Sequence, residues 1–156
     1  MSRTPHRLDR GEHIISWSID VDASASELYA IIACPHRHHE LDGSGTVRST
    51  AIGPRQLIDG DRFRVDMRMK GIPYALTMVT TAAVTDRLVE WRHPGGHRWR
   101  WELEPVSQGV TRITESYDFR GQPAPLRRLL GMTGSHAAND QGIRRSLQKV
   151  HDRFDS

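Results

Sequence analysis

Residues 19–33, IDVDASASELYAIIA, predict a strand that runs directly into a helix. Apolar and polar side chains alternate over residues 12–22, which is the period expected of a half-buried strand. Ser24 and Glu27 then have the spacing of a capping box, in which the two side chains satisfy free amide groups at a helix start. Pro35 is expected to end this helix and to begin a second short one, PHRHHEL. The predicted opening of the fold is therefore a strand followed by two short helices.

The middle of the chain contains only strand patterns. Alternating apolar and polar side chains, separated by Gly, Pro and Asp turns, predict strands at residues 46–52, 62–70, 74–84, 87–92 and 98–104. A further strand is predicted at 110–119, where Glu115 shares its face with Ile113 and Tyr117. One apolar and one polar face in each strand indicate an antiparallel sheet with one face in water.

After Pro123 and Pro125 the apolar period changes from two residues to about three and a half, which is typical of a helix. The stripe predicts a long C-terminal helix and consists of Leu129, Met132, His136, Asn139, Ile143, Leu147, Val150 and Phe154. The prediction begins at Ser135, because Gly131 and Gly134 disfavour helix before it. Whether the helical phase continues across these glycines is left open.

The 156 residues are 37% hydrophobic and 26% charged, which is typical of one folded domain. We expect a flexible basic N-terminus at residues 1–11 and a single domain at residues 12–156. Cys34 is the only cysteine, so an internal disulfide is excluded and a reducing, cytoplasmic setting is expected. No apolar stretch approaches the ~20 residues of a membrane span, so integral membrane association is not expected.

The order of a strand, two short helices, six antiparallel strands and a C-terminal helix resembles the helix-grip fold of the START-like superfamily, the SRPBCC proteins. Residues 19–33, residues 40–48 (ELDGSGTVR) and residues 109–119 (GVTRITESYDF) carry the resemblance. It implies an α+β domain in which a curved antiparallel sheet of about seven strands wraps around the C-terminal helix, with a cavity between them. The superfamily includes polyketide cyclase/dehydrase-like and lipid-transport proteins. The resemblance therefore implies a hydrophobic ligand such as a lipid, sterol or aromatic polyketide, and in a minority of members catalysis of cyclisation or dehydration.

Glu115 is the first candidate for chemistry, because Ile113 and Tyr117 place it on the apolar face of its strand. An ionised carboxylate is unfavourable there unless paired, so we expect a raised pKa or a close hydrogen-bond partner. His136 and Asn139 are the polar positions of the helical stripe, and in a helix-grip arrangement they would face the same cavity. A Glu115–His136 pair would then be able to move a proton on an enolisable ligand. The alternatives are a carboxylate bonded for structural reasons and a helical phase that leaves His136 in solvent.

The predicted ligand-binding residues are mainly aromatic, aliphatic or methionine side chains: Met67, Met69, Trp91, Trp99, Trp101, Ile113, Tyr117, Asn139 and Ile143. We expect a protein that binds a hydrophobic small molecule between the sheet and the C-terminal helix. The alternative is a polyketide cyclase/dehydrase-type enzyme that uses Glu115, together with His136, as general acid or base.

No cofactor or metal is expected, since the sequence lacks phosphate-binding glycine loops, a nucleophile elbow and any cysteine pair. The histidines of segment 36–39 invite a metal hypothesis, but HHELDG lacks the second histidine of HExxH. A solvated helix is the preferred interpretation of this segment.

Basic residues exceed acidic ones by 22 to 19, which gives a formal net charge of +3. The outer face of the predicted sheet carries Arg62, Arg64, Arg68, Lys70, Arg98 and Arg100. A third hypothesis is that these basic residues form a surface that binds RNA or an acidic partner. Nucleic acid is not expected, because the aromatic residues needed for base stacking point to the opposite face. The oligomeric state is open, with a homodimer as one alternative.

Overall fold

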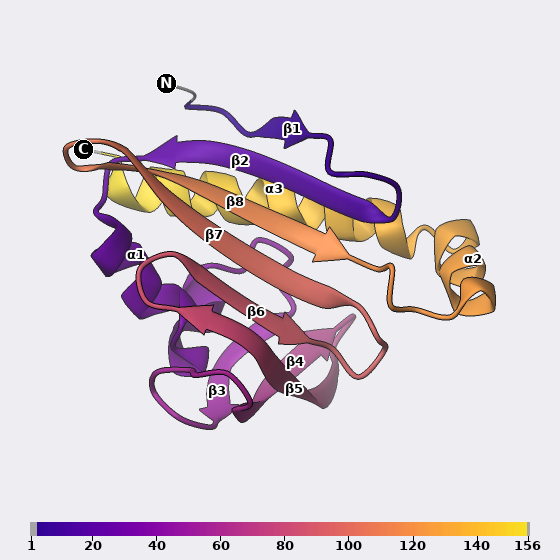
Figure 1. Ribbon diagram of the computed structural model, residues 1–156. Helices are drawn as coiled ribbons and strands as arrows, with labels where there is room; N and C mark the ends of the chain where they lie inside the picture. Colours follow the sequence, from indigo (N-terminus) through magenta and orange to yellow (C-terminus); the bar gives the residue numbers. More distant parts are fainter. Residues whose placement is uncertain (1–2, 156) are drawn as a thin grey trace.

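An antiparallel sheet of eight strands forms the body of the structure, in the order β1-β2-β8-β7-β6-β5-β4-β3 (Figure 1). The computed structural model describes residues 3–155. The strands are β1 (His6–Leu8), β2 (Ile14–Val21), β3 (Val47–Ile52), β4 (Arg62–Met69), β5 (Ile72–Val84), β6 (Leu88–Arg92), β7 (Arg98–Ser107) and β8 (Val110–Asp118). The sequence does not predict β1, which pairs with β2 at the sheet edge and lies in the segment expected to be flexible.

The helices are α1 (Ala25–Ile32), the 3-10 helix η1 (Pro35–Glu40), α2 (Ala124–Met132) and α3 (Ser135–Phe154). The predicted cap of α1 is confirmed, because the amide of Glu27 donates to Ser24 Oγ at 3.1 Å. Gly134 has a φ of 81°, a left-handed conformation that ends one helical segment before α3 begins. Of the helices in residues 3–155, none has the length and apolar character needed to cross a membrane.

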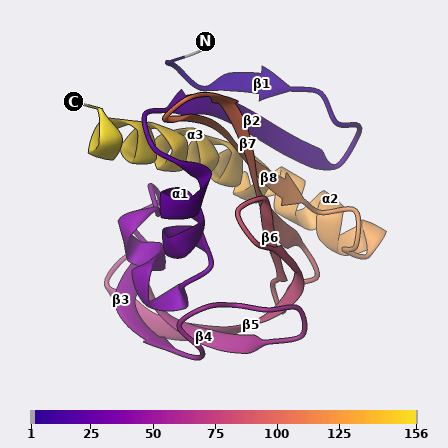
Figure 2. The same cartoon turned by 60° about the vertical axis from the view of Figure 1, so that its left-hand side comes forward.

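The sheet curves strongly, with α1 and α3 on its concave side (Figure 2). Irregular register between Thr80 and Ala82 in β5, and between Val47 and Ala51 in β3, is consistent with β-bulges that bend this half of the sheet. Helix α3 packs chiefly against the opposite half, on β2 and β8. Its buried side chains are Ile143, Ser146, Leu147, Val150 and His151. The predicted curved sheet around a C-terminal helix is therefore confirmed.

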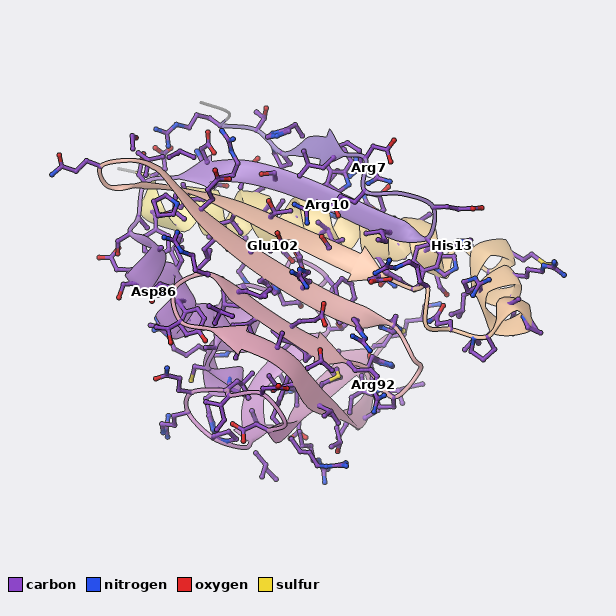
Figure 3. All side chains as sticks on the ribbon, viewed as in Figure 1. Arg7, Arg10, His13, Asp86, Arg92 and Glu102 are labelled. Atoms are coloured by element: carbon purple, nitrogen blue, oxygen red, sulfur yellow. The ribbon has the colours of Figure 1, made fainter. Side chains whose placement is uncertain are left out.

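Arginines on the convex face are largely engaged with carboxylates. Arg112 Nε lies 2.9 Å from Asp20 Oδ1, and Arg98 and Arg100 both bond the buried carboxylate of Glu90. Arg10, which follows β1, bonds Glu102 on β7 (Figure 3). Of the basic residues that the third hypothesis names, Arg98 and Arg100 are thus paired with a carboxylate, while Arg62, Arg64, Arg68 and Lys70 remain exposed.

Candidate functional site

A cavity of about 460 Å³ lies between the concave face of the sheet, the loop after η1 and the first half of α3. Helix α3 rests on β2 and β8, while β3 to β5 curve away from it, so the two walls separate on this side. Apolar and aromatic side chains form most of the lining: Leu41, Val47, Phe63, Val65, Met67, Met69, Tyr74, Leu76, Met78, Trp91, Trp99, Trp101 and Ile143. Its volume and character are those of a small-molecule site.

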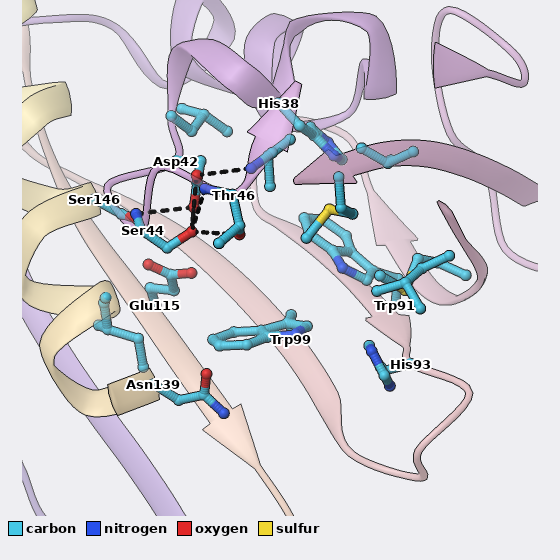
Figure 4. A pocket seen from close by; sticks show the side chains of 18 of the residues that line it. His38, Asp42, Ser44, Thr46, Trp91, His93, Trp99, Glu115, Asn139 and Ser146 are labelled. Carbon is cyan, nitrogen blue, oxygen red and sulfur yellow. Dashed lines mark hydrogen bonds between the residues drawn. The ribbon is translucent and has the colours of Figure 1, made fainter. Parts of the chain in front are cut away.

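Glu115 is the buried acid of this cavity. The strand register places it between Trp17 of β2 and Trp101 of β7, on the concave face. Its side chain points toward Ser44 (Figure 4). The residue is only 6% exposed, and its Oε1 atom has no hydrogen-bond partner in the part of the chain that the structure describes.

Burial raises the pKa of the Glu115 carboxyl well above its ordinary value, and the charge of nearby Asp42 raises it further. The protonated acid is therefore favoured at this position. A neutral carboxyl group both donates and accepts a hydrogen bond, so Glu115 presents a donor to any molecule that enters the cavity.

The loop that holds Asp42 is fixed by hydrogen bonds at both ends. The amides of Ser44 and Val47 donate to the Asp42 carboxylate at 3.1 and 3.2 Å. The amide of Gly43 donates to Ser146 Oγ on α3 at 2.9 Å (Figure 4). A Cβ atom at Gly43 would lie 2.4 Å from backbone atoms of Arg145 and Ser146, so only glycine permits this contact. The loop is thereby positioned beside Glu115, with its own carboxylate facing the same cavity.

Three histidines of the lining are held as neutral imidazoles. His38 stacks on Trp91 at 4.7 Å and donates from Nε2 to the carbonyl of Ile32 at 2.7 Å, and burial lowers its pKa to about 4. His97 stacks between His93 and Tyr117, and burial lowers its pKa to about 3. Burial lowers the pKa of His93 as well. The solvated-helix interpretation of segment 36–39 is thus wrong for His38, which packs into the aromatic core.

His136 lies where the first turn of α3 meets α2 and the end of β8. Tyr117 donates its hydroxyl proton to His136 Nδ1 at 3.0 Å, and His136 Nε2 donates to the carbonyl of Arg127 at 3.0 Å. The imidazole also stacks on Phe119 at 4.1 Å. Both ring nitrogens are therefore occupied by protein groups.

The structure brings most of the predicted site residues to the cavity. The lining includes Glu115, Met67, Met69, Trp91, Trp99, Trp101, Asn139 and Ile143. It does not include His136, Tyr117 or Ile113, so the Glu115–His136 juxtaposition expected from the helical stripe is not formed. The reason is the position of His136 along α3: it lies in the first turn, beside Tyr117 and Phe119 near the end of β8, whereas Asn139 and Ile143 of the following turns line the cavity.

Comparison with known proteins places this architecture in a family. Residues 12–155 match the family described as polyketide cyclase / dehydrase and lipid transport. The chain belongs to this family. Protein Rv0088 of Mycobacterium tuberculosis, described as uncharacterized, is 44% identical over 149 residues, which are 94% of this chain and 66% of that protein. The chain thus spans 66% of the length of the curated relatives it matches.

Several solved structures share the helix-grip fold of this protein. A protein from Arthrobacter aurescens superposes with a TM-score of 0.71 at 15% identity, over 98% of this chain and 93% of that chain. The di-domain ARO/CYC BexL from the BE-7585A biosynthetic pathway has a TM-score of 0.62 at 18% identity, over 90% of this chain and 47% of that chain. At these identities the likeness shows the fold alone.

Several residues of the site in this family member were not predicted from the sequence. Asp42, Ser44 and the pair His93 and His97 all line the cavity. The DGS segment carried a recognisable pattern, since an Asp whose side chain accepts the amide two residues later is a common turn. No local sequence pattern marks His97, because its burial depends on contacts with Tyr117 and Gln122 from distant segments.

Proposed function

We propose that this protein binds a hydrophobic small molecule, of lipid, polyketide or aromatic type, in the cavity between the sheet and α3. The observation that carries the proposal is a largely apolar cavity of about 460 Å³ that contains a single unpartnered buried acid, Glu115. An apolar site with a few directed polar groups is the usual form of a ligand pocket. The family description, which names lipid transport, supports the same class of ligand.

Filling the mouth of the cavity is expected to abolish ligand binding. Ala138 lies on α3 in the cavity lining and is exposed, so Ala138→Trp places an indole in the opening. We expect thermal-shift stabilisation by lipids and aromatic polyketides to disappear in this variant. Native mass spectrometry of freshly purified protein provides a second measure, because a retained ligand would add mass to the wild type only.

Ala137→Trp is the matched control, because Ala137 is the exposed neighbour on the same helix and is not part of the lining. It should bind ligands as the wild type does. If no compound of the panel raises the melting temperature of the wild type, or if Ala138→Trp binds equally well, the cavity is not a binding site.

Catalysis of the cyclase/dehydrase type is the second candidate function, and the raised pKa of Glu115 favours it. A carboxyl group that holds its proton to higher pH is suited to act as general acid, and its conjugate base as general base. Asn139 lines the same cavity and would supply an amide donor for a carbonyl oxygen of the substrate. His136 would act only indirectly, through Tyr117.

Glu115→Gln is expected to lower turnover of a cyclisable poly-β-keto substrate by about a hundredfold or more, because proton transfer by a positioned side chain contributes factors of this size. Binding of the same compound should change little, since glutamine keeps the shape of the side chain. Product formation followed by liquid chromatography, with binding measured in parallel, separates the two effects. Normal turnover in this variant would remove Glu115 from the mechanism.

A further inference from the structure

The charges that face the cavity are unbalanced. Asp42 and Glu115 direct carboxyl groups into it, and Arg145 is the one Lys or Arg side chain that the described lining contains. Arg145 is exposed on the surface of α3, at the rim. Lys149 lies close to the loop, but its Nζ atom donates to the carbonyl oxygens of His39 and Asp42. The inner part of the cavity therefore has acidic groups and no basic side chain to balance them.

Within residues 3–155, neither carboxyl group forms an ion pair with a basic side chain. The Asp42 carboxylate is held by the amides of Ser44 and Val47 and by the hydroxyl of Ser44. Glu115 Oε1 has no partner at all in residues 3–155. The imidazoles of His38, His93 and His97 are kept neutral by burial, so they supply no counter-charge. An ionised Glu115 would thus require a positive charge from outside the chain.

Aromatic side chains surround the same space. Trp99 lies next to Glu115 in the lining, and Trp91, Trp101 and Tyr74 form other parts of the wall. The negative face of an aromatic ring attracts a cation, and rings combined with carboxylates are a recurring way of binding ammonium groups in a desolvated site. Such walls accept the apolar part of the ligand as well.

We propose that the ligand of this cavity carries a basic nitrogen, and that its ammonium group lies against the carboxylate of Glu115 between the aromatic walls. The inference rests on the proposed binding function and names the chemical class of the ligand. A neutral ligand would offer Glu115 only a neutral hydrogen bond, and an anionic ligand would meet two acidic groups. An ammonium group offsets the charge of the Glu115 carboxylate and supplies the hydrogen bond that Oε1 lacks.

The proton balance of the complex follows from this geometry. The free amine is an ammonium ion near neutral pH, so it enters with its proton. Glu115 then ionises and releases its own proton to the buffer, which gives one proton released for each ligand bound to the protonated acid. The titratable groups that share the cavity with Glu115 are Asp42 in the loop, His38 in η1, Tyr74 in β5, His93 and His97 between β6 and β7, and Arg145 in α3. On the β2 side, Trp17 donates to Asp140 of α3, which pairs with Arg144.

A matched set of probes tests the proposal: phenylbutylamine, phenylbutanol and phenylbutyrate share one skeleton and differ in their charge. Isothermal titration calorimetry near neutral pH is carried out in two buffers of different ionisation enthalpy, so that proton release is measured directly. We expect the amine to bind at least about tenfold more tightly than the alcohol, since a desolvated ion pair with cation–π contacts exceeds a neutral hydrogen bond. We expect proton release with the amine and none with the alcohol.

Glu115→Gln should remove the preference for the amine and its proton release while retaining binding of phenylbutanol. Glu102→Gln is the control, because Glu102 bonds Arg10 and Arg100 outside the cavity and should leave the preference unchanged. Equal binding of amine and alcohol, tighter binding of phenylbutyrate, or amine binding without proton release in the wild type would overturn the inference while cavity binding stands. Failure of all three probes and of the lipid and polyketide panel would instead overturn the proposed function.

Discussion

Acid is expected to destabilise this protein steeply, because two buried histidines cannot take up protons in the folded state. Burial lowers the pKa of His38 from 6.5 to about 4 and that of His97 to about 3. In the unfolded chain both imidazoles become charged as the pH falls through 6.5, so the unfolded state gains protons that the folded state does not. Each histidine should therefore remove about 3 kcal/mol of unfolding free energy between pH 6.5 and 4, at about 1.4 kcal/mol per unit of pKa difference.

Glu115 acts in the opposite direction within the same range. Its folded-state pKa lies above the unfolded value of 4.5, so its stabilising contribution is complete below 4.5 and is lost as the pH rises through the folded pKa. Acidification toward 4.5 thus recovers stability at Glu115 while the histidines lose it. The total loss in the wild type should be smaller than the sum for the two histidines, and Glu115→Gln should make it larger.

Urea unfolding at a series of pH values measures these contributions. His38→Gln is expected to reduce the loss on acidification by about 3 kcal/mol, and the difference between variant and wild type at about pH 8 supplies the packing effect alone, since imidazoles are neutral there. His97→Gln should behave in the same way. An acid-dependent loss that is the same in the wild type and in both variants would show that these imidazoles take up protons without unfolding.

The strands and the first helix were predictable because their patterns are local. Alternation of apolar and polar residues predicted β2 to β8, and Ser24 marked the start of α1. The three residues of β1 are too few for a period to emerge, and they become a strand only because β2 offers an unpaired edge.

The position of Glu115 was also predictable, because two-residue spacing places it on the apolar face with Ile113 and Tyr117. The position of His136 was not, since a helical stripe gives the face on which a residue lies but not where along β8 the helix begins, and α3 begins beside Tyr117 and Phe119. The helical stripe also assumes a continuous phase across Gly134, which the chain does not keep, and Leu129 and Met132 before that residue are exposed. The burial of His38 was missed for a related reason: its partner Trp91 is distant in sequence.

Gly43→Ala is expected to disrupt the site by steric means, because it displaces the loop that packs on α3 and changes no side chain with acid or base chemistry. The added methyl group would lie 2.4 Å from the carbonyl carbon of Arg145 and the nitrogen of Ser146, and both are backbone atoms of α3 that cannot turn aside. The loop must therefore move off the helix, and the hydrogen bond from Gly43 to Ser146 Oγ is lost. Forced overpacking of this kind lowers the free energy of unfolding by about 1–3 kcal/mol.

Gly142→Ala is the matched control for this variant. Gly142 lies on α3 across from the same loop, and its Cβ would meet Ser44 Cβ at 3.9 Å, an ordinary contact. Because alanine favours helix over glycine, this control should be more stable than the wild type by as much as about 1 kcal/mol. The two alanine variants are therefore expected to move the urea midpoint in opposite directions, and a shift of the same sign in both would contradict a steric effect specific to Gly43.

Displacement of the loop should also reach Glu115. When the loop leaves α3, water enters beside the carboxyl group and Asp42 moves away, so both causes of the raised pKa weaken together. We expect the Glu115 pKa in Gly43→Ala to fall toward its ordinary value, which ¹³C NMR titration of the side-chain carboxyl measures directly. Ligand affinity should fall with it, because the loop forms one wall of the cavity. An unchanged pKa in a destabilised Gly43→Ala protein would show that the burial of Glu115 depends on the sheet and α3 alone.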